Sequence, residues 1–181
     1  MSGAVDIRLP LGGGSITRRL HGNGKLAARD GELTNVDLIK KIQRVTGMIG
    51  LSKDEQRQAT TFQKLETDFN LHDGLADFSR IYLINPQMEV DGSGTMNLDP
   101  PTLNLTLQTT LSARASARAS RARAASYLKD KQGKITVPLR VTGPVDNPAV
   151  NVNSEKLAET AMPKSVEKGF SSFLKGLFRG R

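Results

Sequence analysis

The sequence predicts an α+β protein built on one long, curved antiparallel β-sheet in the form of an open trough. We expect one helix after the first strands and an amphipathic helix at the C-terminus to cap the sheet. Three observations predict this fold: stretches in which apolar and polar residues alternate, turn-forming residues between those stretches, and two segments with helical periodicity. The sheet domain is expected to occupy residues 1–153, and the basic amphipathic helix 154–181.

The clearest alternating stretch is MEVDGSGTMNLD, residues 88–99. Its apolar residues and glycines share one parity, and its polar residues share the other. Because successive side chains of an extended chain point to opposite faces, this stretch predicts a strand with one apolar face. At about 3.3 Å per residue, a strand over 88–98 spans roughly 36 Å, which is long for a globular domain. The same alternation occurs at 5–9, 65–71, 103–111 and 135–141.

Short turn sequences separate the alternating stretches. They are Asp73-Gly74, Asn85-Pro86, Asp99-Pro100-Pro101 and Gly143-Pro144. Strands with one apolar face and short polar turns are typical of an antiparallel meander. Two similar sequences, at 20–26 and 90–96, place a pair of glycines on the apolar face. Since glycine in a strand marks a bend, a bulge or a close approach, we interpret both pairs as sites of sharp curvature or close helix packing.

The segment TNVDLIKKIQRVTGMIGL, residues 34–51, predicts a helix near 35–51. It begins with a sequence that resembles a capping box, and its apolar residues then recur at helical spacing. These apolar residues are Leu38, Ile42, Val45 and Ile49. We expect this helix to cover one side or one end of the sheet.

The segment VEKGFSSFLKGLF, residues 166–178, predicts a second helix, with one apolar stripe. The stripe consists of Phe170, Phe173, Leu174, Leu177 and Phe178, with Lys175 and Arg179 beside it. Two interpretations stay open: the helix docks on the sheet and closes the core, or it lies at a membrane interface and contacts lipid headgroups. Docking is the commoner use of an apolar helix face.

Charge is unevenly distributed along the chain, whose net charge is +8. Residues 1–111 contain 12 Lys and Arg against 13 Asp and Glu, whereas residues 112–181 contain 14 against 5. This asymmetry indicates a polyanionic partner for the last third, either nucleic acid or an anionic membrane surface. Single-strand binders add stacking aromatic residues, and the basic segment has only Tyr127 nearby, so the membrane surface is favoured over nucleic acid.

Part of the positive charge lies in an Ala/Arg/Ser-rich insertion, residues 112–133. This insertion is either a helix, in which Arg114, Arg118 and Arg121 share one face, or a solvated segment with little apolar surface to bury. We favour the solvated segment and take these three arginines as further candidates for contact with lipid headgroups.

The sequence contains no motif for common catalytic chemistry. It has no phosphate-binding loop, nucleophile-elbow, zinc-protease or EF-hand pattern, and it has no cysteine. Its two histidines, His21 and His72, lie far apart, and His72-Asp73-Gly74 is typical of a turn. We therefore expect no enzyme activity, no catalytic residue, no metal site and no cofactor. No apolar run approaches the ~18 residues that a membrane-spanning helix needs, and the N-terminus has no apolar stretch of signal-peptide length.

Residues 15–153 resemble the C-terminal region of the AsmA family. The order of the motifs carries the resemblance: an aromatic-led strand at Thr60-Thr61-Phe62, an Asp-Gly turn, an Asn-Pro turn, the strand with Gly92-Ser93-Gly94, and an alternating Leu strand. The sequence VPLRVTG, residues 137–143, followed by Asn147-Pro148, continues the match. The Arg-rich insertion departs from the family pattern.

The resemblance implies a non-enzymatic module of bacterial envelope and outer-membrane biogenesis. It implies a position on the periplasmic side of the inner membrane, with the anchor outside this chain, and a groove that binds or conducts phospholipid; envelope proteins are possible partners. The residues expected to line the groove are Leu65, Phe69, Leu71, Val90, Met96, Leu98, Leu103, Leu105, Leu107, Ile135, Val137 and Leu139. Three alternatives stay open: a closed core in a purely structural assembly module, a basic nucleic-acid-binding protein, and a small outer-membrane barrel, against which the scarcity of Tyr and Trp argues.

Overall fold

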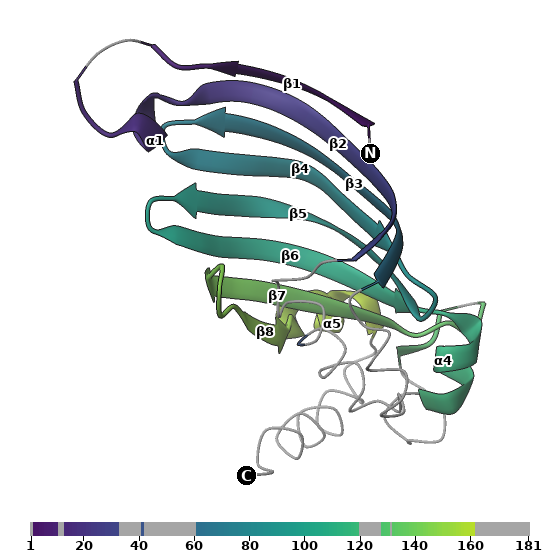
Figure 1. Cartoon of the computed structure of the whole chain (residues 1–181). Coiled ribbons are helices and arrows are strands. Elements are labelled where there is room, and N and C mark those ends of the chain that lie inside the picture. The colour runs from purple at the N-terminus through teal and green to yellow at the C-terminus, as the bar shows by residue number, and fades with distance from the viewer. Residues whose placement is uncertain are drawn as a thin grey trace.

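The computed structural model describes residues 2–10, 13–32, 41, 61–119, 128–130 and 132–161, with only the backbone of 118–119 and 158–161. Within these residues, eight strands form one open antiparallel sheet in which each strand pairs with the next along the chain (Figure 1). The strands are β1 Ser2–Arg8, β2 His21–Glu32, β3 Thr61–His72, β4 Leu75–Ile84, β5 Met88–Leu98, β6 Pro101–Leu111, β7 Thr136–Pro144 and β8 Ala149–Val152. The predicted open, curved antiparallel sheet is thereby confirmed.

Three short helices accompany the sheet in the described part of the chain: α1 Ile16–Arg19, α4 Ala113–Ala119 and α5 Ser154–Ala161. None of them is long and apolar enough to cross a membrane. The helix predicted near 35–51 lies outside the described residues, apart from Lys41, and so does the apolar stripe of 166–178.

The helix α4 begins where the β6 strand ends, because Ser112 supplies an N-cap. The backbone N–H of Ala115 donates to Ser112 Oγ at 3.3 Å. Ala115 and Ser116 are buried, and the Ser116 hydroxyl both donates to the Leu111 carbonyl at 3.2 Å and accepts from the Ile135 N–H at 3.0 Å. The start of the Arg-rich insertion is therefore packed against the end of the sheet, and our preference for a solvated segment is wrong there.

The turn between β3 and β4 consists of two residues, Asp73 and Gly74. Asp73 and Gly74 both have positive φ, 48° and 80°, which is the pattern of a type I′ hairpin turn. At the next turn, the Asn85 side-chain oxygen accepts hydrogen bonds from the backbone N–H groups of Gln87 and Met88, at 2.9 Å each. Both turns lie where the sequence predicts them.

The turn predicted at Gly143-Pro144 lies later in the chain. Both residues still belong to β7, with Gly143 opposite Leu103 and Pro144 opposite Thr102. The chain reverses only after them, where the Asn147 N–H donates to the Pro144 carbonyl at 3.1 Å.

The register gives the sheet two faces of different chemistry. Directly paired residues of an antiparallel ladder lie on the same face, so the pairs can be followed from strand to strand. One set, the apolar face, contains Val5, Ile7, Gly22, Gly24, Leu26, Ala28, Leu65, Thr67, Phe69, Leu71, Ala76, Phe78, Ile81, Leu83, Met88, Val90, Gly92, Gly94, Met96, Leu98, Leu103, Leu105, Leu107, Thr109, Leu111, Ile135, Val137, Leu139, Val141, Val150 and Val152. The intervening residues form the polar face.

The β4 strand keeps this arrangement although its sequence changes parity. Phe78 pairs with Gly94, whereas Ile81 pairs with Gly92, so the register shifts between them. A second shift lies between Asp68 and Phe69 of β3. The extra residue on β4 moves the apolar face from even to odd positions without moving it off the face.

Burial on the apolar face changes from one side of the sheet to the other. Its packed region, defined as Met88, Val90, Leu105, Leu107, Leu111, Ile135, Val137, Leu139 and Val141, is buried. Its open region, defined as Val5, Ile7 and Leu26 on β1 and β2, is 43–52% exposed. Most of the positions on β3 and β4 lie between these limits. The structure thus combines a conventional core with an uncovered apolar surface on one continuous face.

Candidate functional site

The apolar face brings together all twelve residues that the sequence analysis assigned to a groove. Nine of these residues belong to β3, β5 and β6, Val137 and Leu139 belong to β7, and Ile135 directly precedes β7. The Leu111 N–H donates to the Ile135 carbonyl at 2.8 Å, which continues the β6–β7 ladder to that residue. Their common face is an observation; their contact with lipid remains a prediction.

The twelve residues differ in how accessible they are. Seven are buried: Leu71, Val90, Leu105, Leu107, Ile135, Val137 and Leu139. Five are half-buried: Leu65, Phe69, Met96, Leu98 and Leu103. A buried side chain already has its neighbours, so the first group acts as core in this conformation, and the second group borders the open region.

The most exposed part of the face was not among the residues predicted to line the groove. Val5 and Ile7 are 48% and 52% exposed, and Leu26 is 43% exposed. The alternation at 5–9 predicts the orientation of the first two, but alternation contains no information on whether a face is covered. Phe78 and Ile81 were missed for a different reason, because the register shift between them breaks the period of two.

An aromatic pair lies in the middle of the apolar face. The rings of Phe69 and Phe78 have their centroids 6.5 Å apart and are tilted by 57°, a favourable geometry for aromatic side chains. Gly24, directly across from Phe69 on β2, makes room for the ring, because a Cβ there would lie 2.5 Å from Phe69 Cζ. The glycine of the 20–26 sequence therefore permits the close approach of an aromatic ring from the neighbouring strand, where the sequence had led us to expect curvature or a packed helix.

On the polar face, Lys25, Lys64 and Arg80 lie beside carboxylates that neutralise their charge. Lys64 Nζ lies 2.9 Å from Glu66 Oε1, and Arg80 lies 3.5 Å from the other Glu66 oxygen. The hydrogen bond from Lys64 is the main reason why the pKa of Glu66 lies below its usual range. Lys25 is likewise 3.5 Å from Asp68. These lysines and this arginine each have a carboxylate beside them, which weakens the case for a polyanion bound on this part of the sheet.

Tyr82 lies between two of these cations. Lys64 Nζ is 5.3 Å and the Arg80 guanidinium 5.2 Å from the centre of its ring, both within the range of cation–π interactions. Its hydroxyl donates to Glu89 Oε1 at 2.8 Å, and this bond raises the pKa of Tyr82. The cluster ties β3, β4 and β5 together on the polar face, and we interpret it as structural.

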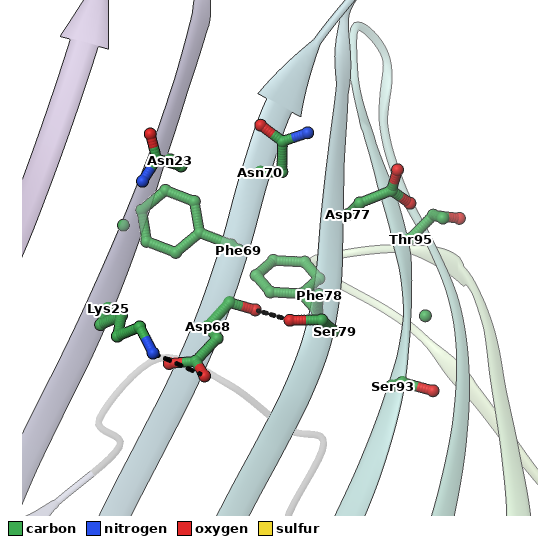
Figure 2. Close-up of a pocket in the computed structure, with 12 residues that line it drawn as sticks. Asn23, Lys25, Asp68, Phe69, Asn70, Asp77, Phe78, Ser79, Ser93 and Thr95 are labelled. Carbon is green, nitrogen blue, oxygen red and sulfur yellow. Dashed lines mark hydrogen bonds and ion pairs between the residues drawn. The ribbon is translucent and has the colours of Figure 1, made fainter.

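A hollow of about 600 Å³ lies across β2, β3, β4 and β5 (Figure 2). Its lining combines eight polar residues from these four strands with Phe69, Phe78, Gly24 and Gly94 of the apolar face. The polar lining residues are Asn23, Lys25, Asp68, Asn70, Asp77, Ser79, Ser93 and Thr95. The hollow is open, and its one cationic residue, Lys25, pairs with Asp68. The lining thus combines an aromatic pair with polar residues from four neighbouring strands.

His72 makes the closest polar contact of the β3–β4 hairpin. Its Nε2 lies 2.7 Å from Asp77 Oδ2, and its Nδ1 lies 3.5 Å from Asp73 Oδ2. The hydrogen bond to Asp77 is the main cause of a raised pKa at His72. Among the residues that the structure describes, no group of three or more His, Asp or Glu side chains is arranged to hold a metal ion.

The residues predicted to contact headgroups are described only in part. Arg114 is exposed on α4, and of Arg118 only the backbone is described. The others lie outside the described residues: Arg121, Phe170, Phe173, Leu174, Lys175, Leu177, Phe178 and Arg179. Their proposed role depends on the sequence alone.

Comparisons with known proteins add no family assignment. No protein-family model, no curated protein and no solved structure matches the chain. Function is therefore inferred from the chemistry of the two faces and from the order of motifs in the sequence.

Proposed function

We propose that this protein is a non-enzymatic lipid-handling module of the AsmA-like type, which binds or conducts phospholipid along the apolar face of its sheet. The observation that carries the proposal is the open region, where Val5, Ile7 and Leu26 remain about half exposed on a face that is otherwise apolar from β1 to β8. Soluble proteins seldom leave a contiguous apolar surface uncovered without a binding role.

An acyl chain is a suitable occupant for such a surface. Burying hydrocarbon on an apolar surface is worth ~0.8 kcal/mol per CH₂ group, so a chain lying across several strands gains substantial free energy without any polar contact. The half-buried Phe69, Phe78 and Met96 extend the exposed residues of β1 and β2 across β3 to β5. The exposed Arg114 of α4 and the basic C-terminal third would meet the phosphate of the headgroup.

The experiment is a pair of substitutions on one strand. Leu26→Glu puts a charge on the apolar face, and Asn23→Glu puts the same charge on the polar face of β2, where Asn23 is exposed. We expect the first to lower phospholipid binding at least about fivefold and the second to leave it unchanged. Binding is measured by native mass spectrometry of purified protein with phosphatidylglycerol and phosphatidylethanolamine, and by flotation with vesicles of the same lipids.

Three results would overturn this assignment. The unsubstituted protein binds neither free lipid nor vesicles; both substitutions lower binding equally; or binding falls only because Leu26→Glu unfolds the sheet, which circular dichroism detects. The exposed position of Leu26 makes the last outcome an informative control, because a substitution there is expected to change stability by no more than about 0.5 kcal/mol.

A purely structural module with a closed core is the second candidate. The observation that favours it is the packed region, where Ile135, Leu139 and Val141 have no exposed surface. This candidate predicts no lipid binding and no difference between the two glutamate variants. Salt-resistant gel shifts with duplex or single-stranded oligonucleotides would instead support the basic nucleic-acid-binding alternative.

We further propose that the module acts on the periplasmic side of the inner membrane in envelope biogenesis, as the resemblance to the AsmA family implies. The test is fractionation of cells that express the natural reading frame with an epitope tag. Accumulation of the protein in the cytosol would contradict this location without contradicting lipid binding.

A further inference from the structure

The two edges of the sheet are protected to different degrees. At one edge β8 has only four residues, and the chain continues to cover β7 beyond it, with the Asn153 N–H donating to the Pro138 carbonyl at 2.8 Å and α5 packing beside it. At the other edge β1 has seven residues, and all seven are exposed. An open edge strand presents every second backbone N–H and C=O group to a new strand.

The β1 edge also concentrates exposed apolar side chains. The described part of the chain has five exposed large hydrophobic residues, and four of them lie on β1, directly after it, or next to it on β2: Val5, Ile7, Leu9 and Leu26. Between Val5, Ile7 and Leu9, on the other face, lie Asp6 and Arg8. Their side chains are 61% and 80% exposed and only 3.5 Å apart along one strand.

We propose that the β1 strands of two copies of this chain pair antiparallel, about a two-fold axis through Ile7. In this register Ile7 lies opposite Ile7 of the second copy, and Val5 lies opposite Leu9. Asp6 lies opposite Arg8 of the second copy, and the symmetry repeats this pair on the other side of the axis. The segment is thus complementary to itself in both charge and hydrophobicity, as an isologous interface requires.

The neighbouring register is less favourable. An axis through Val5 places Asp6 opposite Ala4 and Arg8 opposite Ser2, so neither charge faces an opposite charge. In the register about Ile7, Pro10 lies opposite Ala4. Because proline has no N–H to donate, the ladder of backbone hydrogen bonds ends there. The apolar face of one copy continues into that of the other, since antiparallel partners share a face.

The ladder is short, so we expect a weak dimer with a dissociation constant on the order of 10–100 µM, because stable interfaces bury about 1,200–2,000 Å². The proposal does not depend on lipid binding, and its tests are carried out without lipid. A failure of the dimer leaves the lipid assignment intact, and a failure of lipid binding leaves the dimer intact.

The first test uses charge reversal and sedimentation velocity over a range of protein concentrations. Asp6→Arg and Arg8→Asp each place like charges opposite one another, and we expect either to weaken self-association about tenfold. An equimolar mixture of the two variants restores complementary pairs in a mixed dimer, and the double variant restores them in a homodimer. Lys134→Asp, an exposed charge reversal in the loop before β7, is the control that should leave association unchanged.

The second test uses the absence of cysteine from the chain to determine the register. Ile7→Cys places two thiols across the two-fold axis, within reach of a disulfide, whereas Val5→Cys does not. We expect the first variant to form covalent dimers under mild oxidation and the second to remain monomeric. A monomer at all concentrations together with no cross-link for Ile7→Cys overturns the proposal, and faster cross-linking of Val5→Cys overturns this register.

Discussion

Leu139 on β7 and Leu26 on β2 belong to the same face of the same sheet, yet Leu139 has no exposed surface and Leu26 is 43% exposed. Both occupy positions that the alternating pattern assigns to the apolar side. The difference between them teaches that the period of two fixes the orientation of a side chain, whereas its burial depends on which elements cover the sheet at that point. The packed region forms the core, whereas the open region is exposed to solvent.

The largest expected effect separates these two regions directly. Leu139→Ala leaves a cavity among fully buried neighbours and should lower the free energy of unfolding by about 2–5 kcal/mol. Leu26→Ala removes the same atoms from a side chain that is already about half exposed to water. It should change the free energy of unfolding by no more than about 0.5 kcal/mol. Urea unfolding followed by circular dichroism measures both. Equal losses would mean that the open region is covered in solution.

The next effect concerns the backbone of the strand that the sequence predicted best. Gly94 has φ of +148°, and a Cβ there would collide with the Asn104 carbonyl oxygen and lie 2.7 Å from Leu105 Cα. Gly94→Ala should therefore lower the free energy of unfolding by more than about 1 kcal/mol. Gly13, near α1 on the open side, has free space around it, and Gly13→Ala is the matched control. A neutral Gly94→Ala would show that β5 relaxes easily at this bend.

The strand that contains Gly94 shows how far sequence reasoning reaches. The bounds predicted for it, 88–98, are those of β5, because every apolar residue there keeps one parity. The β4 strand escaped the same analysis, since the shift between Phe78 and Ile81 moves its apolar residues from even to odd positions. A bulge depends on how two strands pair, so it cannot be predicted from the sequence of one strand alone.

The candidate site was predictable in orientation and not in accessibility. All twelve proposed lining residues lie on one face, but seven of them are buried, and the most exposed residues of that face were not among the twelve. The cover over the packed region includes Ala115 of α4, from a segment whose composition indicated little apolar surface to bury. Coverage depends on which distant segment folds over the sheet, and no local pattern contains that information.

A smaller effect tests the polarity of the two faces within the packed region. Thr109 is fully buried on the apolar face, and its hydroxyl has no hydrogen-bond partner among the residues that the structure describes. Thr109→Val removes an unsatisfied polar group and should raise the free energy of unfolding by about 1 kcal/mol.

The adjacent Thr110 provides the matched comparison on the polar face. Its hydroxyl lies 3.0 Å from that of Thr136, so the same substitution removes a hydrogen bond. Thr110→Val should lower the free energy of unfolding by about 0.5–1.5 kcal/mol. Opposite signs for two neighbouring threonines would confirm the assignment of the faces. A loss of stability for Thr109→Val would instead indicate that its hydroxyl is satisfied in solution.

The smallest effect is a dependence of stability on pH at the hairpin that borders the open side of the sheet. The contact with Asp77 raises the pKa of His72 above its usual 6.5, so the folded state holds this proton more tightly than the unfolded state does. The stabilisation is fully present below pH 6.5 and is lost as the pH rises through the higher pKa of the folded protein. His72→Gln should remove this part of the pH dependence, whereas the same substitution at His21, exposed at the start of β2, should retain it. Thermal melts between pH 5.5 and 8.5 distinguish the two, and identical profiles for both variants would mean that the His72–Asp77 contact does not persist in solution.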